Sequence, residues 1–200
     1  MGDDGALRIV IEIFEEAGFH VIGAAEIAPN LLPPSGVLIG TLPEGIEAEI
    51  AVAQKTLAEM GRADLGQALV VRGGQVLAQE DARGTDAMLS DLAPEMPDFG
   101  GSDGWDIVED ALTSVVNWIT GHKTEAPQDY PAEGGLLFKA PKPGQELRAD
   151  MPVIGMGTAM KAAEAGLAGI VIQAGGVMVL NLDGVQQVLE AHGMFLWVRP

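Results

Sequence analysis

The stretch that decides the fold is residues 134–157, which read GGLLFKAPKPGQELRADMPVIGMG. It opens with a strand-like apolar run, Leu136 to Phe138, and it closes with the apolar Met-Pro-Val-Ile that follows Asp150. Two prolines and a glycine restrict the segment between these runs, because proline locks φ and glycine permits positive φ. The stretch therefore predicts a rigid loop that follows a buried strand.

Charged side chains are concentrated in this loop. Lys139, Lys142 and Arg148 are cations, and Asp150 supplies a carboxylate. Cations neutralise phosphate groups, and a carboxylate can hold Mg²⁺ or orient a water molecule. One interpretation is a site for a phosphate ester; the alternative is a solvated surface turn.

Composition limits the classes of protein that fit. The 200 residues suit one large domain or two small ones. The chain has no cysteine, so disulfides and thiolate metal sites are excluded. Its net charge of −18 disfavours nucleic acid as a partner, since nucleic-acid-binding chains are usually basic. No segment approaches the roughly 18 consecutive apolar residues of a membrane span.

Common catalytic motifs are missing. The sequence contains no G-x-S-x-G elbow, no P-loop and no G-x-G-x-x-G after a strand. His20, His122 and His192 are scattered, which argues against a histidine-ligated zinc site. If the chain hydrolyses a phosphate bond, it must use carboxylates, cations and Mg²⁺.

Hydrophobic spacing predicts a mixed α/β (α+β) fold. Residues 3–17 are expected to form a helix that ends at Gly18, followed by a short strand at 19–22. A second helix is expected over 43–60, with Gly61 as its stop, and a β-hairpin over 67–80 with Gly73-Gly74 as its turn. Thr85 or Asp86 would cap the next helix, although Asp86 could equally have a functional role. The second half alternates β-α-β-β-α-β, with Thr158 as the cap of its first helix and Gly184–His192 as the second.

We expect two small domains, each with a mixed sheet flanked by helices, and a substrate cleft between them. The boundaries follow from composition: 1–93 forms the first domain, 94–133 a linker or insertion rich in proline and acids, and 134–200 the second domain. Residues 107–119 within the linker are expected to form one amphipathic helix.

Several short motifs together resemble a known family. They are GDD at 2–4, FEEAGF at 14–19, GTDAM at 84–88, KAPKPGQ at 139–145, DMPVIG at 150–155 and AGLAGI at 165–170. This set resembles the UDP-2,3-diacylglucosamine pyrophosphatase family of lipid A biosynthesis, of the type found in alphaproteobacteria. The resemblance covers almost the whole chain outside 94–133.

The resemblance implies a Mg²⁺-dependent hydrolase with its substrate between two domains. It would cleave UDP-2,3-diacylglucosamine to UMP and 2,3-diacylglucosamine 1-phosphate (lipid X), with water attacking the β-phosphorus. Asp150 is the expected catalytic residue and the expected Mg²⁺ ligand. The expected substrate-binding residues, by the matching motifs, are Gly84, Thr85, Asp86, Lys139, Lys142, Gln145 and Arg148.

The chain also departs from the family pattern. It begins at a motif that lies well inside the family's proteins, so the start of the N-terminal domain is expected to be missing. Glu146 stands where the family usually has Asp, and 94–133 is longer than the usual connection. Two alternatives stay open: a non-catalytic acyl-sugar- or nucleotide-binding remnant, and an interaction module that uses Trp105 and Trp118.

A location and an association state follow from these expectations. The pyrophosphatase is expected in the cytoplasm, and a diacyl substrate implies peripheral contact with the inner membrane without a transmembrane segment. Strand edges and apolar helix faces left uncovered by the missing start predict either poor solubility or a homodimer.

Overall fold

The computed structural model describes residues 3–94 and 132–200. The helices are α1 (Asp3–Glu16), α2 (Ala24–Ile27), the 3₁₀ turn η1 (Pro29–Leu31), α3 (Glu47–Arg62), α4 (Thr85–Leu92), α6 (Met156–Glu164) and α7 (Leu182–Ala191). The strands are β1 (Gly36–Ile39), β2 (Ala68–Arg72), β3 (Gln75–Gln79), β4 (Leu136–Lys139), β5 (Val153–Ile154), β6 (Gly169–Gln173), β7 (Met178–Val179) and β8 (Phe195–Arg199).

Six strands form one mixed sheet in the order β1-β8-β6-β4-β2-β3. The central strands β4, β6 and β8 are parallel, whereas β1, β2 and β3 pair antiparallel with their neighbours. A separate parallel pair joins β5 to β7. The mixed α/β class predicted from the sequence is therefore confirmed.

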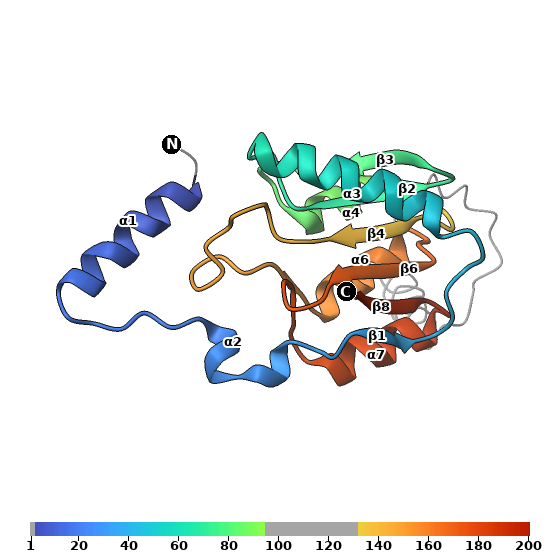
Figure 1. Ribbon diagram of the computed structural model, residues 1–200. Coiled ribbons are helices and arrows are strands. Elements are labelled where there is room, and N and C mark those ends of the chain that lie inside the picture. Colours follow the sequence, from blue (N-terminus) through green and yellow to red (C-terminus); the bar gives the residue numbers. More distant parts are fainter. Residues whose placement is uncertain (1–2, 95–131) are drawn as a thin grey trace, which may run out of the picture.

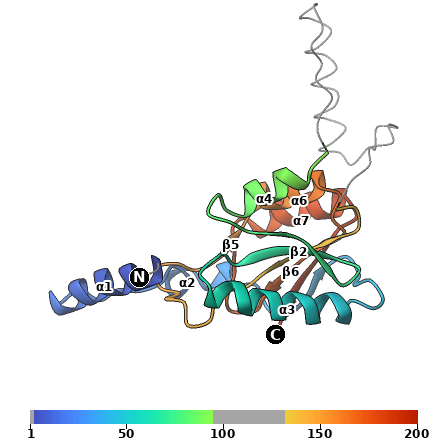
Figure 2. The ribbon, with the colours of Figure 1, turned by 90° about the horizontal axis from the view of Figure 1, so that it is seen from above.

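Helices cover both faces of the sheet, as Figure 2 shows, with α3 on one side and α4, α6 and α7 on the other. Side chains alternate along each strand, so each face has its own apolar cluster. Phe138, Val171 and Phe195 pack with Ala53 and Met60 of α3. On the opposite face, Leu137, Ile170 and Leu196 belong to the cluster that contains Leu89 of α4, Ala159 of α6 and Leu189 of α7.

The expected pair of domains is not confirmed. Strands β1 to β3 come from residues 1–93 and strands β4, β6 and β8 from 134–200, yet all six are hydrogen-bonded into one sheet. The physical reason is the pairing of β2 with β4, in which Val70 lies opposite Leu137 and joins the two ranges edge to edge. The predicted linker helix at 107–119, with Trp105 and Trp118, lies outside the described residues.

An arm made of α1 and α2 extends from the body (Figure 1). The helix at 3–17 is confirmed, and Gly18 follows it with a φ of 88°. The strand predicted at 19–22 is wrong: these residues are irregular, since they pair with no strand in the described part of the chain and a lone strand is unstable. Apolar side chains of the arm are exposed, among them Ile13, Phe14 and Phe19.

Two local predictions about glycine have different outcomes. The hairpin is confirmed, with Gly73 and Gly74 at φ values of 57° and 72°, as a two-residue primed turn requires. Gly61 is not the stop of its helix, because α3 continues to Arg62. It lies instead where a Cβ would be 2.5 Å from the ring of Pro143, so its small size lets the 140–150 loop approach α3.

Candidate functional site

The site is built around Lys139, the last residue of β4. Lys139 lies two residues after Leu137, so it shares the face of the sheet that α4, α6 and α7 cover. Its side chain is 7% exposed, and its ammonium donates a hydrogen bond of 2.8 Å to Oγ1 of Thr85 at the start of α4. The predicted loop lysine is thus a buried strand residue that joins two segments far apart in sequence.

Acidic side chains surround this ammonium. The carboxylates of Glu80, Asp86 and Asp150 all act on Lys139 and favour its charged form. Burial acts more strongly in the opposite direction, so the pKa of Lys139 lies below its ordinary value. A buried ammonium among three carboxylates is typical of functional sites, although structural ion pairs also produce it.

Asp86 lies in the first turn of α4 and is exposed to solvent. The hydroxyl of Thr158, in the first turn of α6, donates a long hydrogen bond of 3.5 Å to Asp86 Oδ1. The positive end of the α6 dipole favours a carboxylate at this place. The sequence predicted Thr85 or Asp86 as the N-cap of α4, and this prediction is wrong. The N-cap residue is Gly84, with a φ of 88°. Thr158 is likewise not the cap of α6, which begins after Gly155.

Asp150 is held by its own loop. Gln145 Nε2 donates hydrogen bonds of 2.7 Å to both the backbone oxygen and Oδ2 of Asp150. The amide oxygen of Gln145 accepts a bond of 2.8 Å from the backbone N–H of Lys142. Gln145 therefore braces the carboxylate, and both polar ends of its amide are engaged within the loop.

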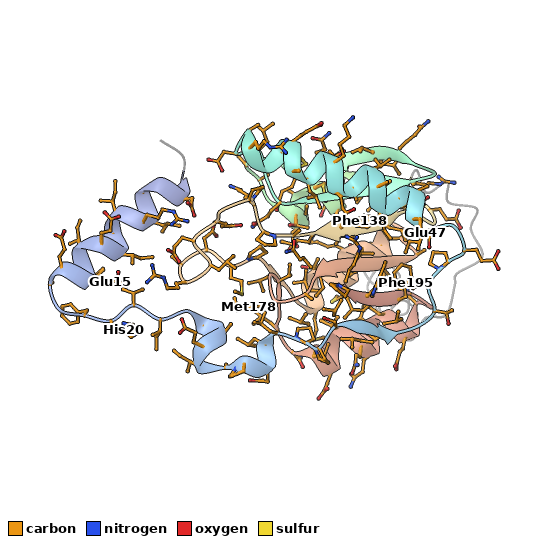
Figure 3. The ribbon with its side chains drawn as sticks, in the orientation of Figure 1. Glu15, His20, Glu47, Phe138, Met178 and Phe195 are labelled. Carbon is orange, nitrogen blue, oxygen red and sulfur yellow. The ribbon has the colours of Figure 1, made fainter. Side chains whose placement is uncertain are left out.

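The other two cations of the motif are paired away from Lys139. Lys142 binds Asp64, just beyond α3. Arg148 binds Glu146 at 2.9 Å and Glu15 of α1 at 2.8 Å. Figure 3 labels Glu15 on the arm and Phe138 in the body, and the loop runs between them. Lys139 follows Phe138 in the sequence. The structure thus brings together Gly84, Thr85, Asp86, Lys139, Gln145 and Asp150, but not Lys142 and Arg148.

The arm binds the loop through polar contacts. Asp4 Oδ1 accepts from the backbone N–H of Glu146 at 2.5 Å, and Arg8 donates to the backbone oxygen of Gly144 at 2.5 Å. Hydrogen bonding from Arg148 lowers the pKa of Glu146 to about 2. These contacts attach α1 to the segment that carries Asp150.

Sequence reasoning missed two residues of the site. Glu80 is buried directly after β3, and its carboxylate joins Thr85 to the backbone of Gln67. Thr158 was expected only as a cap. The available signal for Glu80 was one of two adjacent acids, Glu80 and Asp81, at the end of the predicted hairpin. Without the fold, it is indistinguishable from a surface acid.

A pocket of about 330 Å³ lies on the α3 side of β4 and β6. Its lining includes Gln54, Phe138, Pro141, Gln173 and Arg199. The Gln54 amide lies 2.7 and 3.0 Å from the terminal nitrogens of Arg199. The pocket adjoins the strand ends that carry Lys139, the edge at which α/β sheets bind ligands. Lys139 itself is among the lining residues, whereas Asp86 belongs to α4 on the other side of the sheet (Figure 2).

Metal binding by protein side chains alone is not indicated in the described ranges. Residues 3–94 and 132–200 contain no group of three or more His, Asp or Glu side chains placed to hold an ion. Within the same ranges, no helix has the length and apolar character needed to cross a membrane.

Comparison with known proteins identifies the family. The family model for the LpxI C-terminal domain matches residues 34–197, a range that contains Glu80, Thr85, Asp86, Lys139 and Asp150. The chain is 38% identical over 197 residues to the UDP-2,3-diacylglucosamine pyrophosphatase LpxI of Caulobacter vibrioides, a match that covers 98% of this chain. The chain spans 60% of the length of that curated relative. The family expected from the sequence motifs is confirmed, and the chain belongs to the LpxI family.

Proposed function

We propose that this protein takes part in lipid A biosynthesis by hydrolysing the pyrophosphate bond of UDP-2,3-diacylglucosamine to UMP and lipid X. The observation that carries the proposal is the buried Lys139 ammonium, with Asp86 and Asp150 close enough to act on it, at the carboxyl end of β4. A cation flanked by carboxylates suits a reaction that moves negative charge between phosphoryl oxygens. Membership of the LpxI family and the name of the Caulobacter relative supply the substrate.

Each residue has a role that its contacts support. Asp150, braced by Gln145, orients the water whose oxygen forms a bond to the β-phosphorus. The bond from the β-phosphorus to the bridging oxygen breaks, and that oxygen leaves with UMP. Lys139 offsets charge on the phosphoryl oxygens, and the N-terminus of α4, which begins at Thr85, favours a nearby anion. The backbone N–H of Gly84 already donates to the carbonyl oxygen of Asp81.

The donor set fits Mg²⁺ bound mainly through substrate. Mg²⁺ usually takes one or two carboxylates and completes its shell with phosphate oxygens and water. Asp150, with Asp86 as a second oxygen donor, would hold the ion without a three-residue cage. The ion would polarise a phosphoryl oxygen.

Lys142 and Arg148 would bind phosphate only by exchanging partners. Lys142 is paired with Asp64, and Arg148 with Glu146 and Glu15. Substrate phosphate would compete with these carboxylates. This pairing also favours a second candidate, a non-catalytic acyl-sugar- or nucleotide-binding protein, because a single cation, Lys139, is then left in the acidic cluster among the described residues.

The test is release of UMP from UDP-2,3-diacylglucosamine, with Mg²⁺ and with EDTA. We expect Mg²⁺-dependent release that falls by about 100-fold or more in Asp150→Asn. Glu190→Gln, a carboxylate-to-amide change at an exposed position near the end of α7, serves as the control and should leave the rate unchanged. Binding of lipid X without UMP release would support the non-catalytic candidate, and absence of both would refute the proposal.

Cytoplasmic location, peripheral membrane contact and a homodimer complete the proposal. A substrate with two acyl chains requires apolar surface, and the arm exposes Ile13, Phe14, Phe19 and Ile27. Light scattering tests the dimer, and sedimentation with substrate-containing vesicles tests the contact.

A further inference from the structure

Glu80 is a buried acid whose two carboxylate oxygens are both used. The side chain is 9% exposed. Oε2 accepts a hydrogen bond of 2.7 Å from the backbone N–H of Gln67, and Oε1 accepts one of 2.6 Å from the hydroxyl of Thr85. An ionised carboxylate can only accept, so the direction of both bonds is fixed.

The backbone around Glu80 is also constrained. Its N–H donates to the backbone oxygen of Ala68 at 2.9 Å. Gly66 lies against it with a φ of 140°, and a Cβ there would be 2.7 Å from the carbonyl oxygen of Glu80. Only glycine suits that position, so the segment before β2 packs closely on Glu80.

The direction of these bonds determines how Lys139 is held. Because the Thr85 hydroxyl gives its only proton to Glu80, its lone pairs face the other way and accept from the Lys139 ammonium. A hydroxyl whose proton is already committed cannot rotate to donate elsewhere. The ammonium keeps two further N–H donors for neighbouring oxygens.

We propose that Glu80 is a positioning residue that acts through the Thr85 hydroxyl to hold the Lys139 ammonium beside Asp86 and Asp150. The contribution of Glu80 to catalysis rests on the proposed pyrophosphate hydrolysis. Glu80 would touch no substrate atom; it would fix the donor that does. The alternative is that Glu80 merely satisfies the backbone of Gln67 and closes the core.

The test is an NMR measurement of the lysine side-chain amines in the full chain. The chain has five lysines, Lys55, Lys123, Lys139, Lys142 and Lys161, so the ¹⁵Nζ signals can be assigned by single Lys→Arg variants. In the wild type, the buried and hydrogen-bonded Lys139 is expected to exchange its protons slowly. In Glu80→Gln, the amide nitrogen that replaces one carboxylate oxygen cannot accept a hydrogen bond, so either Gln67 or Thr85 loses its acceptor. We expect Lys139 proton exchange at least about tenfold faster.

Two further variants separate positioning from folding. Thr85→Val keeps the Glu80 charge but breaks the link, and it should accelerate Lys139 exchange as Glu80→Gln does. Glu190→Gln should change nothing. If Glu80→Gln does not fold, Thr85→Val alone decides, and an unchanged Lys139 signal in either folded variant overturns the proposal.

Kinetics distinguish this proposal from the proposed function. If the wild type hydrolyses UDP-2,3-diacylglucosamine, Glu80→Gln should lower kcat with little change in KM, and Glu80→Asp should restore part of the loss. A wild type that releases no UMP refutes the proposed function, whereas the NMR result still tests the link from Glu80 to Lys139. If Glu80→Gln accelerates proton exchange of Lys139 but leaves kcat unchanged, the contact from Glu80 through Thr85 to Lys139 has no role in catalysis.

Discussion

The ammonium of Lys139 donates to the hydroxyl of Thr85 at 2.8 Å across 54 positions of sequence. This bond joins the carboxyl end of β4 to the first residue of α4, and both side chains are buried. It connects GTDAM and KAPKPGQ, two of the six motifs that carry the family resemblance. Glu80 directly follows β3 of the hairpin and accepts a hydrogen bond from the same hydroxyl. Because β2 pairs with both β3 and β4, the site depends on the pairing of β2 with β4.

Thr85→Val should destabilise the fold by about 1–3 kcal/mol, because it leaves buried polar groups of Glu80 and Lys139 without their partner. The valine has nearly the same shape, so packing changes little. Urea denaturation measures the effect. Thr85→Ser should restore most of the loss, and Thr41→Val at an exposed position is the control. A loss in Thr85→Val no larger than in Thr41→Val would contradict the role of the hydroxyl.

Gly61→Ala should also destabilise the chain, by about 1–3 kcal/mol, through overpacking. Alanine normally stabilises a helix relative to glycine by up to about 1 kcal/mol, but here its Cβ would lie 2.5 Å from the Pro143 ring. Gly157→Ala in α6 is the matched control, since its Cβ would meet only a carboxylate oxygen of Asp86 at 4.0 Å. The midpoints of thermal unfolding of the two variants are compared. Equal midpoints would show that the 140–150 loop moves away from α3 at no cost in stability.

Much of the fold could be predicted from local sequence, because helix periodicity and turn glycines act over short distances. The hairpin at Gly73-Gly74 and the helix after Asp3 are examples. The pairing of β2 with β4 could not be predicted, since the two strands are more than sixty residues apart in sequence and the pairing has no local signal. The predicted strand at 19–22 followed apolar alternation, but alternation alone cannot supply a neighbouring strand.

The site was also predicted only in part, because motifs are local whereas burial and ion-pair partners depend on residues far apart in sequence. Asp86, Lys139 and Asp150 were identified from motifs, and the structure brings them together. The sequence did not separate Lys139, which is buried, from Lys142 and Arg148, whose partners Asp64 and Glu15 lie in distant segments. Glu80 escaped notice because burial, rather than residue type, distinguishes it from the other acids of the chain.

The Glu146 carboxylate lies 3.7 Å from Arg8 of α1 and also holds Arg148, which pairs with Glu15 of α1. Docking of the arm should therefore depend on pH through Glu146. The pKa of Glu146 in the fold is lowered to about 2 from 4.5, so its contribution is fully present above about 4.5 and is lost as the pH falls toward 2. Glu146→Gln should loosen the arm at neutral pH. Since the chain has no cysteine, a fluorophore pair at Ala6→Cys and Glu190→Cys can report the distance.

The control for Glu146→Gln is Glu16→Gln, which changes an exposed carboxylate at the end of α1. We expect the distribution of distances between the fluorophores at positions 6 and 190 to be broader in Glu146→Gln than in the wild type, and to be unchanged in Glu16→Gln. Added salt should broaden the wild type too, because Arg8 and Arg148 are partly exposed. A distribution that is unaffected by Glu146→Gln and by salt would show that other contacts hold the arm.

Lys139→Met should remove UMP release and yet raise the thermal midpoint at neutral pH. The pKa of Lys139 is lowered, so the desolvation of its ammonium outweighs the attraction of Glu80, Asp86 and Asp150. A base with a lowered pKa in the fold costs stability while both states are charged, and that cost disappears as the pH rises toward 10.5. The advantage of the methionine variant should therefore shrink in alkaline solution. Lys55→Met, at an exposed position of α3, should show neither effect. A midpoint for Lys139→Met below that of the wild type would mean that the ammonium stabilises the fold, and UMP release equal to that of the wild type would show that Lys139 has no role in the reaction.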